Sequence, residues 1–365
     1  MTKCYGIQGD AELHHIDHVG LICHIMDAPI LFTDEDNFKL AQKYYPQFKK
    51  EIVEWRDLAP DRLVHRGDVI FYTNFFGRES SMPKLRELRH NLGKTIRSVC
   101  CPHGNSDKGH SSVFMEHFEQ EDIVLVYGQR MINFLYEKNV RSPTLITVGN
   151  YRLSYYLKER VFFDELAKIE ILSHFSNPFK PLVLYAPTWE DWENGTSFFA
   201  ATEQLIAQLP KQYNLVVKCH PRLLQTSLTK VWQLQDIISK REDVVILTDY
   251  PHVYPLLALA DFYIGDMSSI GYDFLYFDRP LFFLNHKGWD FKANNGLKLF
   301  KAGVVIEPAD FERIFDQINI EISKPDAYRG ARQTLYQETF GPPIDLNTLK
   351  QRIQNAYEVD CFSKI

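Results

Sequence analysis

Tyr213-Asn-Leu-Val-Val-Lys-Cys-His-Pro-Arg222 and Ala260-Asp-Phe-Tyr-Ile-Gly-Asp-Met-Ser-Ser269 are the two stretches that decide the fold. Each contains a short apolar strand followed by polar side chains, and the second turns into a helix at that corner. In open parallel α/β sheets, ligands bind in the crevice outside the carboxyl ends of the strands. We therefore expect these two strand ends to meet at one crevice that binds a diphosphate.

Strand and helix signals alternate along the chain in two separate series. The first closes with strands expected at 123–126 and 144–148; a charged helical stretch follows at 153–174, and the second opens with a strand at 182–185. This alternation predicts two doubly wound, Rossmann-like α/β domains that face each other across a cleft. We place the first domain at residues 1–152, the second at residues 153–335, and a helical tail, with the option of crossing back, at residues 336–365.

The composition is that of an ordinary globular protein, with 365 residues, 45% of them hydrophobic, and a formal net charge of -6. The negative charge argues against nucleic acid as a partner, so an anionic ligand needs a local basic cluster. No run reaches the roughly 18 apolar residues of a membrane-spanning helix. Residues 1–10 contain no apolar signal core. Peripheral contact with a membrane stays open.

The cysteines and the missing nucleotide motifs narrow the class of protein further. Cys4, Cys23, Cys100, Cys101, Cys219 and Cys361 form no CxxC pair, which favours reduced thiols in the cytoplasm. The chain contains neither a GxGxxG fingerprint nor a GxxxxGK(S/T) loop, which disfavours a dehydrogenase-type dinucleotide site and a P-loop. We expect no cofactor and no structural metal.

The basic residues and hydroxyls of the opening stretches are the candidate phosphate contacts. Lys218, His220 and Arg222 follow one strand and can neutralise or donate to phosphate oxygens. Ser268 and Ser269 stand at a helix start, where hydroxyls and unpaired N–H groups suit a phosphate. The simpler interpretations are solvated strand ends and ordinary helix caps.

Two neighbouring positions complete this candidate site. Thr188 follows the strand expected at 182–185 and is a further candidate contact, with Trp189 as a wall of the cleft. The simpler interpretation, favoured for this segment alone, is a strand end with a packed tryptophan. Asp266 would repel a phosphate placed close to it, so we assign it an orienting role or a helix cap.

His103 is the candidate general base, because it follows an expected strand and histidine titrates near neutral pH. The alternative is an ordinary loop histidine. The residues after it, Asn105, Ser106, Asp107 and Lys108, form a polar loop. His14-His-Ile-Asp-His18 looks like a metal cluster, but its spacing suits a helical pair of ligands poorly, and a helix start is favoured.

An ordered series of short motifs resembles the CDP-glycerol glycerophosphotransferase family, which builds teichoic acids and related capsule polymers. The series is His103-Gly104, Ala186-Pro-Thr-Trp189, Lys218 to Arg222, Leu256-Leu257 before Ala260-Asp261, Asp266-Met-Ser-Ser269, Asp273 and Arg279-Pro280. The similarity is firm over 182–284 and thinner before it. The resemblance implies a GT-B fold with an acceptor-side first domain and a nucleotide-donor second domain. It also implies that His103 is the base, that His220 and Arg222 hold the diphosphate, and that Ser268 and Ser269 bind phosphate.

The loop after His103 departs from the family pattern, because Asn105-Ser-Asp-Lys-Gly109 stands where Pro-Leu-Lys is common. That loop is expected to face the acceptor, so the acceptor stays open. The leading hypothesis is transfer of a glycerophosphate or related polyol phosphate from a CDP-activated donor to an acceptor hydroxyl on a glycan or glycolipid, in the cytoplasm or at the inner face of its membrane. The alternatives are a GT-B glycosyltransferase that uses a nucleotide sugar and a non-catalytic protein that binds one.

Overall fold

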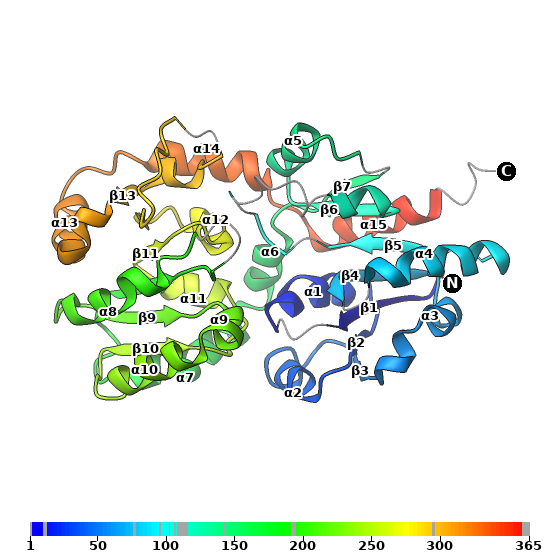
Figure 1. Cartoon of the computed structure of the whole chain (residues 1–365), viewed down its shortest axis with the longest axis horizontal. Coiled ribbons are helices and arrows are strands. Elements are labelled where there is room, and N and C mark those ends of the chain that lie inside the picture. Colours follow the sequence, from blue (N-terminus) through cyan, green and yellow to red (C-terminus); the bar gives the residue numbers. More distant parts are fainter. Residues whose placement is uncertain are drawn as a thin grey trace. The chain divides into compact units, whose positions relative to one another are not determined.

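The computed structural model describes residues 2–9, 13–75, 78–94, 96–101, 103–105, 107, 116–141, 144–190, 195–293 and 296–359. The chain divides into two compact units (Figure 1). The first unit comprises Met1–His103, Ser111–Tyr155 and Phe340–Ile365, and the second comprises Gly104–His110 and Tyr156–Thr339. Our expected boundary lies after residue 152 and leaves Gly104 in the first domain, so the structure divides the chain differently there.

A seven-stranded parallel sheet forms the centre of the first unit in the part of the chain that the structure describes. Its order is β3-β2-β1-β4-β5-β6-β7, so the chain reverses direction across the sheet between β1 and β4. The strands are β1 (Cys4–Gly9), β2 (Ile30–Phe32), β3 (Lys50–Ile52), β4 (Val69–Phe75), β5 (Arg97–Cys100), β6 (Ile123–Val126) and β7 (Leu145–Thr147).

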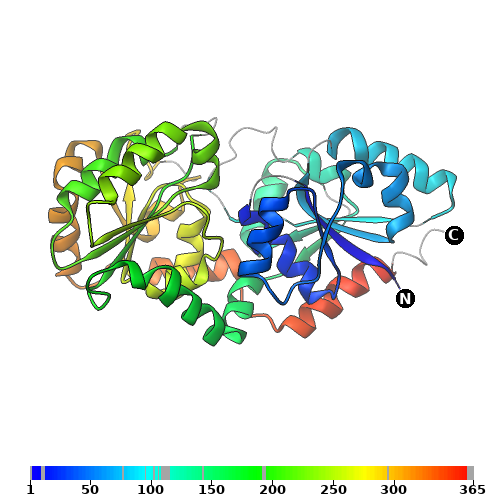
Figure 2. The same ribbon diagram turned by 90° about the horizontal axis from the view of Figure 1, so that it is seen from below.

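Helices lie on both faces of this sheet (Figure 2). Helix α1 packs on β1 and β4 and contacts α15, while α3 and α4 pack together. The helices are α1 (Val19–Ile25), α2 (Glu35–Tyr44), α3 (Pro60–Arg66), α4 (Arg78–Asn91), α5 (Gln129–Glu137), α6 (Tyr151–Lys158) and α15 (Leu346–Val359), with 3-10 helices η1 (Leu13–Asp17), η2 (Trp55–Leu58) and η4 (Glu116–Gln120).

β1, an interior strand of this sheet between β2 and β4, was not predicted from the sequence. Its six residues include two glycines and Gln8, a composition that favours strands poorly. Gly6 is needed because a Cβ atom there would lie 2.2 Å from the Sγ of Cys23 in α1. Close approach of α1 thus replaces the apolar side chains by which a central strand is normally recognised.

A six-stranded parallel sheet forms the centre of the second unit, again among the described residues. Its order is β10-β9-β8-β11-β12-β13, which places the reversal between β8 and β11. The strands are β8 (Leu182–Ala186), β9 (Asn214–Lys218), β10 (Val244–Leu247), β11 (Phe262–Gly265), β12 (Leu281–Leu284) and β13 (Val304–Ile306).

One face of this sheet packs against α8, α10 and α13 through a fully apolar core that includes Phe198, Leu234 and Phe315. Helix α11 contacts β8, α7 and α12. The helices are α7 (Arg160–Glu170), α8 (Phe198–Gln208), α9 (Pro221–Thr226), α10 (Leu228–Ile238), α11 (Tyr254–Leu259), α12 (Ser269–Phe274), α13 (Ile314–Ile322) and α14 (Arg329–Phe340), with 3-10 helices η5 (Leu172–His174), η6 (Leu275–Phe277), η7 (Leu299–Ala302) and η8 (Pro308–Arg313).

The predicted fold class, two doubly wound parallel α/β sheets, is confirmed by the two strand orders. The single helical stretch expected at 153–174 is wrong in detail, because it is divided into α6, α7 and η5. Glu159, between α6 and α7, has φ -103° and ψ 24°, outside the geometry of a continuing α-helix.

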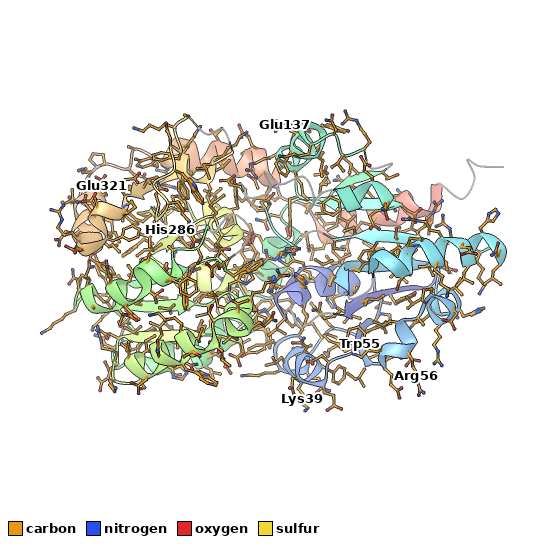
Figure 3. All side chains as sticks on the ribbon, viewed as in Figure 1. Lys39, Trp55, Arg56, Glu137, His286 and Glu321 are labelled. Carbon is orange, nitrogen blue, oxygen red and sulfur yellow. The ribbon has the colours of Figure 1, made fainter. Side chains whose placement is uncertain are left out.

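The surface of the first unit carries exposed charged and aromatic side chains, among them Lys39, Trp55 and Arg56 (Figure 3). None of the helices in the described ranges is both long and apolar enough to cross a membrane.

Candidate functional site

The second unit gathers most of the predicted residues at the carboxyl edge of its sheet. Strands β8 and β11 are neighbours at the point where the strand order reverses, and β9 lies beside β8. Thr188 follows β8, Asp266 follows β11, and His220 follows β9. A reversal of strand order opens a crevice at the carboxyl ends of the strands, where α/β proteins bind ligands.

Asp266 ties these strand ends together. It is 1% exposed, and it accepts hydrogen bonds from the Thr188 N–H at 2.9 Å, the Ser197 N–H at 2.8 Å and the Ser197 hydroxyl at 2.9 Å. With its oxygens turned to these donors, the carboxylate organises the site, which agrees with the orienting role. Ser197 itself was missed, although Thr196-Ser197 before an apolar run is a helix-start signal.

Thr188 lies after β8, as predicted, but its backbone N–H and carbonyl already form hydrogen bonds within the protein. Its carbonyl accepts a hydrogen bond from the Thr196 hydroxyl at 2.7 Å, and the residue is buried. The segment after β8 is therefore held on both sides, by Asp266 and by Thr196.

Lys218, the last residue of β9, is also buried and bonded. Its ammonium donates to the Tyr250 carbonyl at 2.9 Å, in the loop after β10. The next residue, Cys219, is buried as well, and burial raises the pKa of its thiol to about 12. The thiol is therefore protonated near neutral pH, which excludes Cys219 as a thiolate nucleophile.

His220 is the N-cap of α9, and this fixes its protonation pattern. Its Nδ1 accepts a hydrogen bond from the backbone N–H of Arg222 at 3.2 Å. Because Nδ1 is the acceptor, a neutral imidazole carries its proton on Nε2. The Nε2–H group is then a donor of the kind that a phosphate oxygen requires.

Arg222 and His220 share an aromatic neighbour, Trp189. The Arg222 guanidinium lies over the indole ring at 4.4 Å from its centroid, and the His220 ring lies 6.2 Å from it. Stacking on an aromatic ring restricts a guanidinium without using its N–H groups in the ring plane. Trp189 thus brings a cation and an imidazole to one side of the segment after β8.

Ser268 and Ser269 begin α12, as expected. The Ser268 hydroxyl accepts from the Ile270 N–H at 3.4 Å and is the N-cap, so the simpler interpretation of this serine also holds. Ser268 is buried, whereas Ser269 is partly exposed.

The loop that follows His103 packs within the second unit, against α12. Gly104 has φ +126°, and a Cβ atom there would lie 2.7 Å from the Cβ of Ser269, so glycine is required for both reasons. Asp107 is buried and accepts from the Tyr272 hydroxyl and, at 2.8 Å, from the Leu299 N–H. Ser106 and Lys108, which we also predicted in this loop, lie outside the described residues.

His103 ends its segment of the first unit, at the carboxyl edge of that sheet, beside histidines from the 3-10 helix η1. Its ring centroid lies 4.7 Å from that of His15 and 6.1 Å from that of His14. From the sequence, His14 and His15 were expected to be metal ligands or, by preference, part of a helix start, and not neighbours of His103. No group of three or more His, Cys, Asp or Glu residues in the described part of the chain is arranged to hold a metal ion.

His18, at the start of α1, lies deeper in the first unit. Its Nδ1 is 2.7 Å from the Tyr127 hydroxyl. Burial, followed by the positive charge of Arg152, lowers the pKa of His18 well below 6.5. Arg152 is itself buried and pairs with Asp17. His18 is therefore neutral near neutral pH.

One segment of this chain matches a family of known proteins. The CDP-glycerol:poly(glycerophosphate) glycerophosphotransferase family matches over residues 170–297. This part of the chain is therefore similar to the members of that family. The predicted resemblance is thus confirmed. The glycerophosphotransferase region, residues 170–297, contains Thr188, Lys218, His220, Arg222, Ser268 and Ser269, whereas His103 and the loop after it lie outside it.

Two curated relatives of the chain are teichoic acid glycerol-phosphate primases. The protein of Bacillus subtilis is 24% identical over 205 residues, which cover 52% of this chain and 51% of that protein. The protein of Bacillus spizizenii is 29% identical over 187 residues, which cover 50% of this chain and 45% of that protein. The chain thus spans about half the length of the curated relatives it matches.

Solved structures resemble the chain beyond the glycerophosphotransferase region. The wall teichoic acid polymerase TagF aligns with a TM-score of 0.62 at 14% identity, over 98% of this chain and 88% of that one. Anabaena HepE in complex with UDP-glucose aligns with a TM-score of 0.55 at 15% identity, over 98% of this chain and 100% of that one. At these identities the likeness establishes the fold and not the substrate.

Proposed function

We propose that the protein transfers a glycerophosphate, or a related polyol phosphate, from a CDP-activated donor to an acceptor hydroxyl. The observation that carries this proposal is the position of the glycerophosphotransferase region. That region contains the strand ends at the reversal of the second sheet, together with His220, Arg222 and the α12 serines. The family match and a strand-end cluster of donors thus support the same site.

The donor diphosphate is proposed to bind at these strand ends. His220 donates from Nε2 to a phosphate oxygen, Arg222 adds a cation beside Trp189, and the Ser268 and Ser269 hydroxyls complete the contacts. Lys218 contributes positive charge from its buried position, and Thr188 lines the segment after β8. Charge-assisted hydrogen bonds of this kind contribute about 1.5–3 kcal/mol each.

His103 is proposed as the general base for the acceptor. It takes the proton of the acceptor hydroxyl while that oxygen attacks the β-phosphorus of the donor. A new P–O bond to the acceptor forms as the P–O bond to CMP breaks, and CMP leaves with its additional negative charge. His220, Arg222 and the two serines stabilise that charge, which is where preorganised donors accelerate a transfer most.

The nucleotide product tests this function. The purified protein is incubated with CDP-glycerol and candidate glycan or glycolipid acceptors, and the released nucleotide is identified by chromatography. Release of CMP that depends on acceptor supports the proposal. Release of a nucleoside diphosphate from a UDP- or GDP-sugar would instead assign the protein as a glycosyltransferase. Saturable donor binding with no release would assign it as a non-catalytic nucleotide-sugar binder.

The acceptor and the place of action are parts of the same proposal. We propose that the protein works in the cytoplasm on a glycan or glycolipid acceptor, with peripheral contact at the inner face of the membrane. No disulfide links Cys4, Cys23, Cys100, Cys101 or Cys219, which suits a reducing compartment. Fractionation of cells that express the full chain, with and without a high-salt wash, tests whether it associates with membranes.

A further inference from the structure

Asn105 is a buried polar residue whose side chain has no partner. It is 5% exposed, and its Nδ2 group is fully buried and donates to no acceptor among the residues that the structure describes. Buried polar groups nearly always have a hydrogen-bond partner, because a buried and unpaired donor loses its bonds to water without replacement. An unpaired donor of this kind calls for a specific explanation.

The residues on both sides of Asn105 are anchored to α12 and its surroundings. On one side, Gly104 lies so close to Ser269 that a Cβ atom could not be accommodated. On the other side, Asp107 accepts from the Tyr272 hydroxyl and from the Leu299 N–H. Consecutive Cα atoms are about 3.8 Å apart, so Asn105 is confined next to the first turn of α12.

These contacts also distinguish the role of Asp107 from that of Asn105. Each carboxylate oxygen of Asp107 already accepts one hydrogen bond within the second unit, so this acid holds the loop in place. The carboxamide of Asn105, by contrast, presents a neutral N–H donor. Such a donor can bind a phosphate or hydroxyl oxygen without adding charge to a site that already contains His220 and Arg222.

We infer that Asn105 binds the CDP-activated substrate, and that its Nδ2 group donates a hydrogen bond to an oxygen of the β-phosphate or of the polyol attached to it. The inference rests on the proposed function, since it takes the Ser268–Ser269 corner as the phosphate site. It changes the expected role of the loop. Asn105, predicted together with Ser106, Asp107 and Lys108 to face the acceptor, becomes part of the donor site on the second unit.

The test compares stability and donor affinity in Asn105→Ala. Melting of the ligand-free protein should be unchanged or slightly raised, because the deleted donor has no protein acceptor. The dissociation constant for CDP-glycerol, measured by calorimetry, should rise about tenfold or more, the scale of one hydrogen bond to a charged group. Asn105→Asp should weaken binding further, because it brings a carboxylate towards a phosphate.

Asn214→Ala is the matched control. Asn214 is equally buried in the second unit, but it begins β9 at the opposite edge of the sheet, and its Nδ2 group donates to the Asn177 carbonyl at 2.8 Å. This variant should melt at a lower temperature and bind CDP-glycerol with unchanged affinity.

Two failures can be told apart. If Asn105→Ala binds CDP-glycerol like the wild type while Arg222→Ala binds it weakly, the amide does not contact the nucleotide substrate and the inference is overturned. If Arg222→Ala and Ser268→Ala also bind it normally, the donor site itself is misplaced and the proposed function fails with it. A melting temperature that falls in Asn105→Ala as it does in Asn214→Ala would likewise overturn the inference, because it would reveal a structural partner.

Discussion

His103 and His220 both follow strands of parallel sheets, yet the two units hold them differently. His220 is fixed by its own helix, through the bond from the Arg222 N–H, and by Trp189 in the segment after the neighbouring strand β8. His103 instead lies against His14 and His15, which are far away in the sequence. A histidine capped by its own helix has a defined donor nitrogen, which suits a phosphate contact. The first unit therefore places His103 by ring contacts with a distant segment, whereas the second places His220 by a local helix cap.

The largest expected effect is on the framework of the second unit. Asp266→Ala removes the acceptor of the Thr188 N–H, the Ser197 N–H and the Ser197 hydroxyl, all of which are buried. Orphaned buried donors cost about 1–3 kcal/mol each, so unfolding free energy should fall by about 3 kcal/mol or more. Urea denaturation measures the loss. A change of less than about 0.5 kcal/mol would mean that the strand ends are held by other contacts.

His103→Ala should lower the rate of transfer without weakening the binding of CDP-glycerol, unlike substitutions of His220. Loss of a general base should lower kcat by about 10²-fold or more, while CDP-glycerol affinity stays close to that of the wild type. Steady-state rates and calorimetry on the same preparation provide the test. His65→Ala, an exposed histidine of the first unit, is the control and should match the wild type in both. Near-normal turnover in His103→Ala would remove the base assignment.

Substitutions can distinguish the roles of the two ring nitrogens of His220. Asparagine retains a helix-capping acceptor for the Arg222 N–H but lacks the Nε2–H group, whereas leucine lacks both. His220→Asn should therefore keep most of the stability and bind CDP-glycerol more weakly by about 1.5–3 kcal/mol. His220→Leu should lose donor affinity and in addition about 1 kcal/mol of unfolding free energy. Equal donor affinity in His220→Asn and the wild type would contradict the phosphate contact.

The lowered pKa of the buried His18 should make the stability of the first unit depend on pH. Its folded pKa lies below 6.5, so below pH 6.5 the unfolded chain binds a proton that the folded protein does not. Stability is therefore lost as pH falls from 6.5 towards the folded pKa, by at most about 1.4 kcal/mol per pH unit. His18→Gln should reduce this slope in denaturation series between pH 7 and pH 5. An unchanged slope would show that other groups dominate.

The smallest expected effect is that of metal removal. His220, Arg222 and Lys218 supply the positive charge that a diphosphate needs. The adjacent acids Glu190 and Asp191, of which Asp191 lies outside the described residues, are the nearest substitute for a metal-binding pair of carboxylates. Transfer activity should be the same after exhaustive EDTA treatment as before it. Activity that disappears and returns only with Mg²⁺ or Mn²⁺ would bring Glu190 and Asp191 into the site.

Features with a local signal could be predicted from the sequence. The strand-to-helix corner at Ser268 follows from a hydroxyl at an N-cap, and the place of His220 follows from an apolar strand that ends before Pro221. Features that depend on close packing, and not on a pattern of side chains, could not be predicted. β1 escaped detection because Gly6 is required by Cys23 of α1, a contact that composition cannot reveal. Ser197 escaped because its acceptor, Asp266, is distant in the sequence.

The sequence by itself determined the alternation of strands and helices, the two doubly wound sheets, and the polar residues that end β8, β9 and β11. These features depend on hydrophobic period, caps and strand ends, which are encoded within a few residues. Only the tertiary structure decided that Asp266 binds Thr188 and Ser197, that His14 and His15 surround His103, and that Gly104 and Asp107 pack on α12. Those contacts join residues far apart in the chain, and they form because burial leaves each polar group to find a partner in three dimensions.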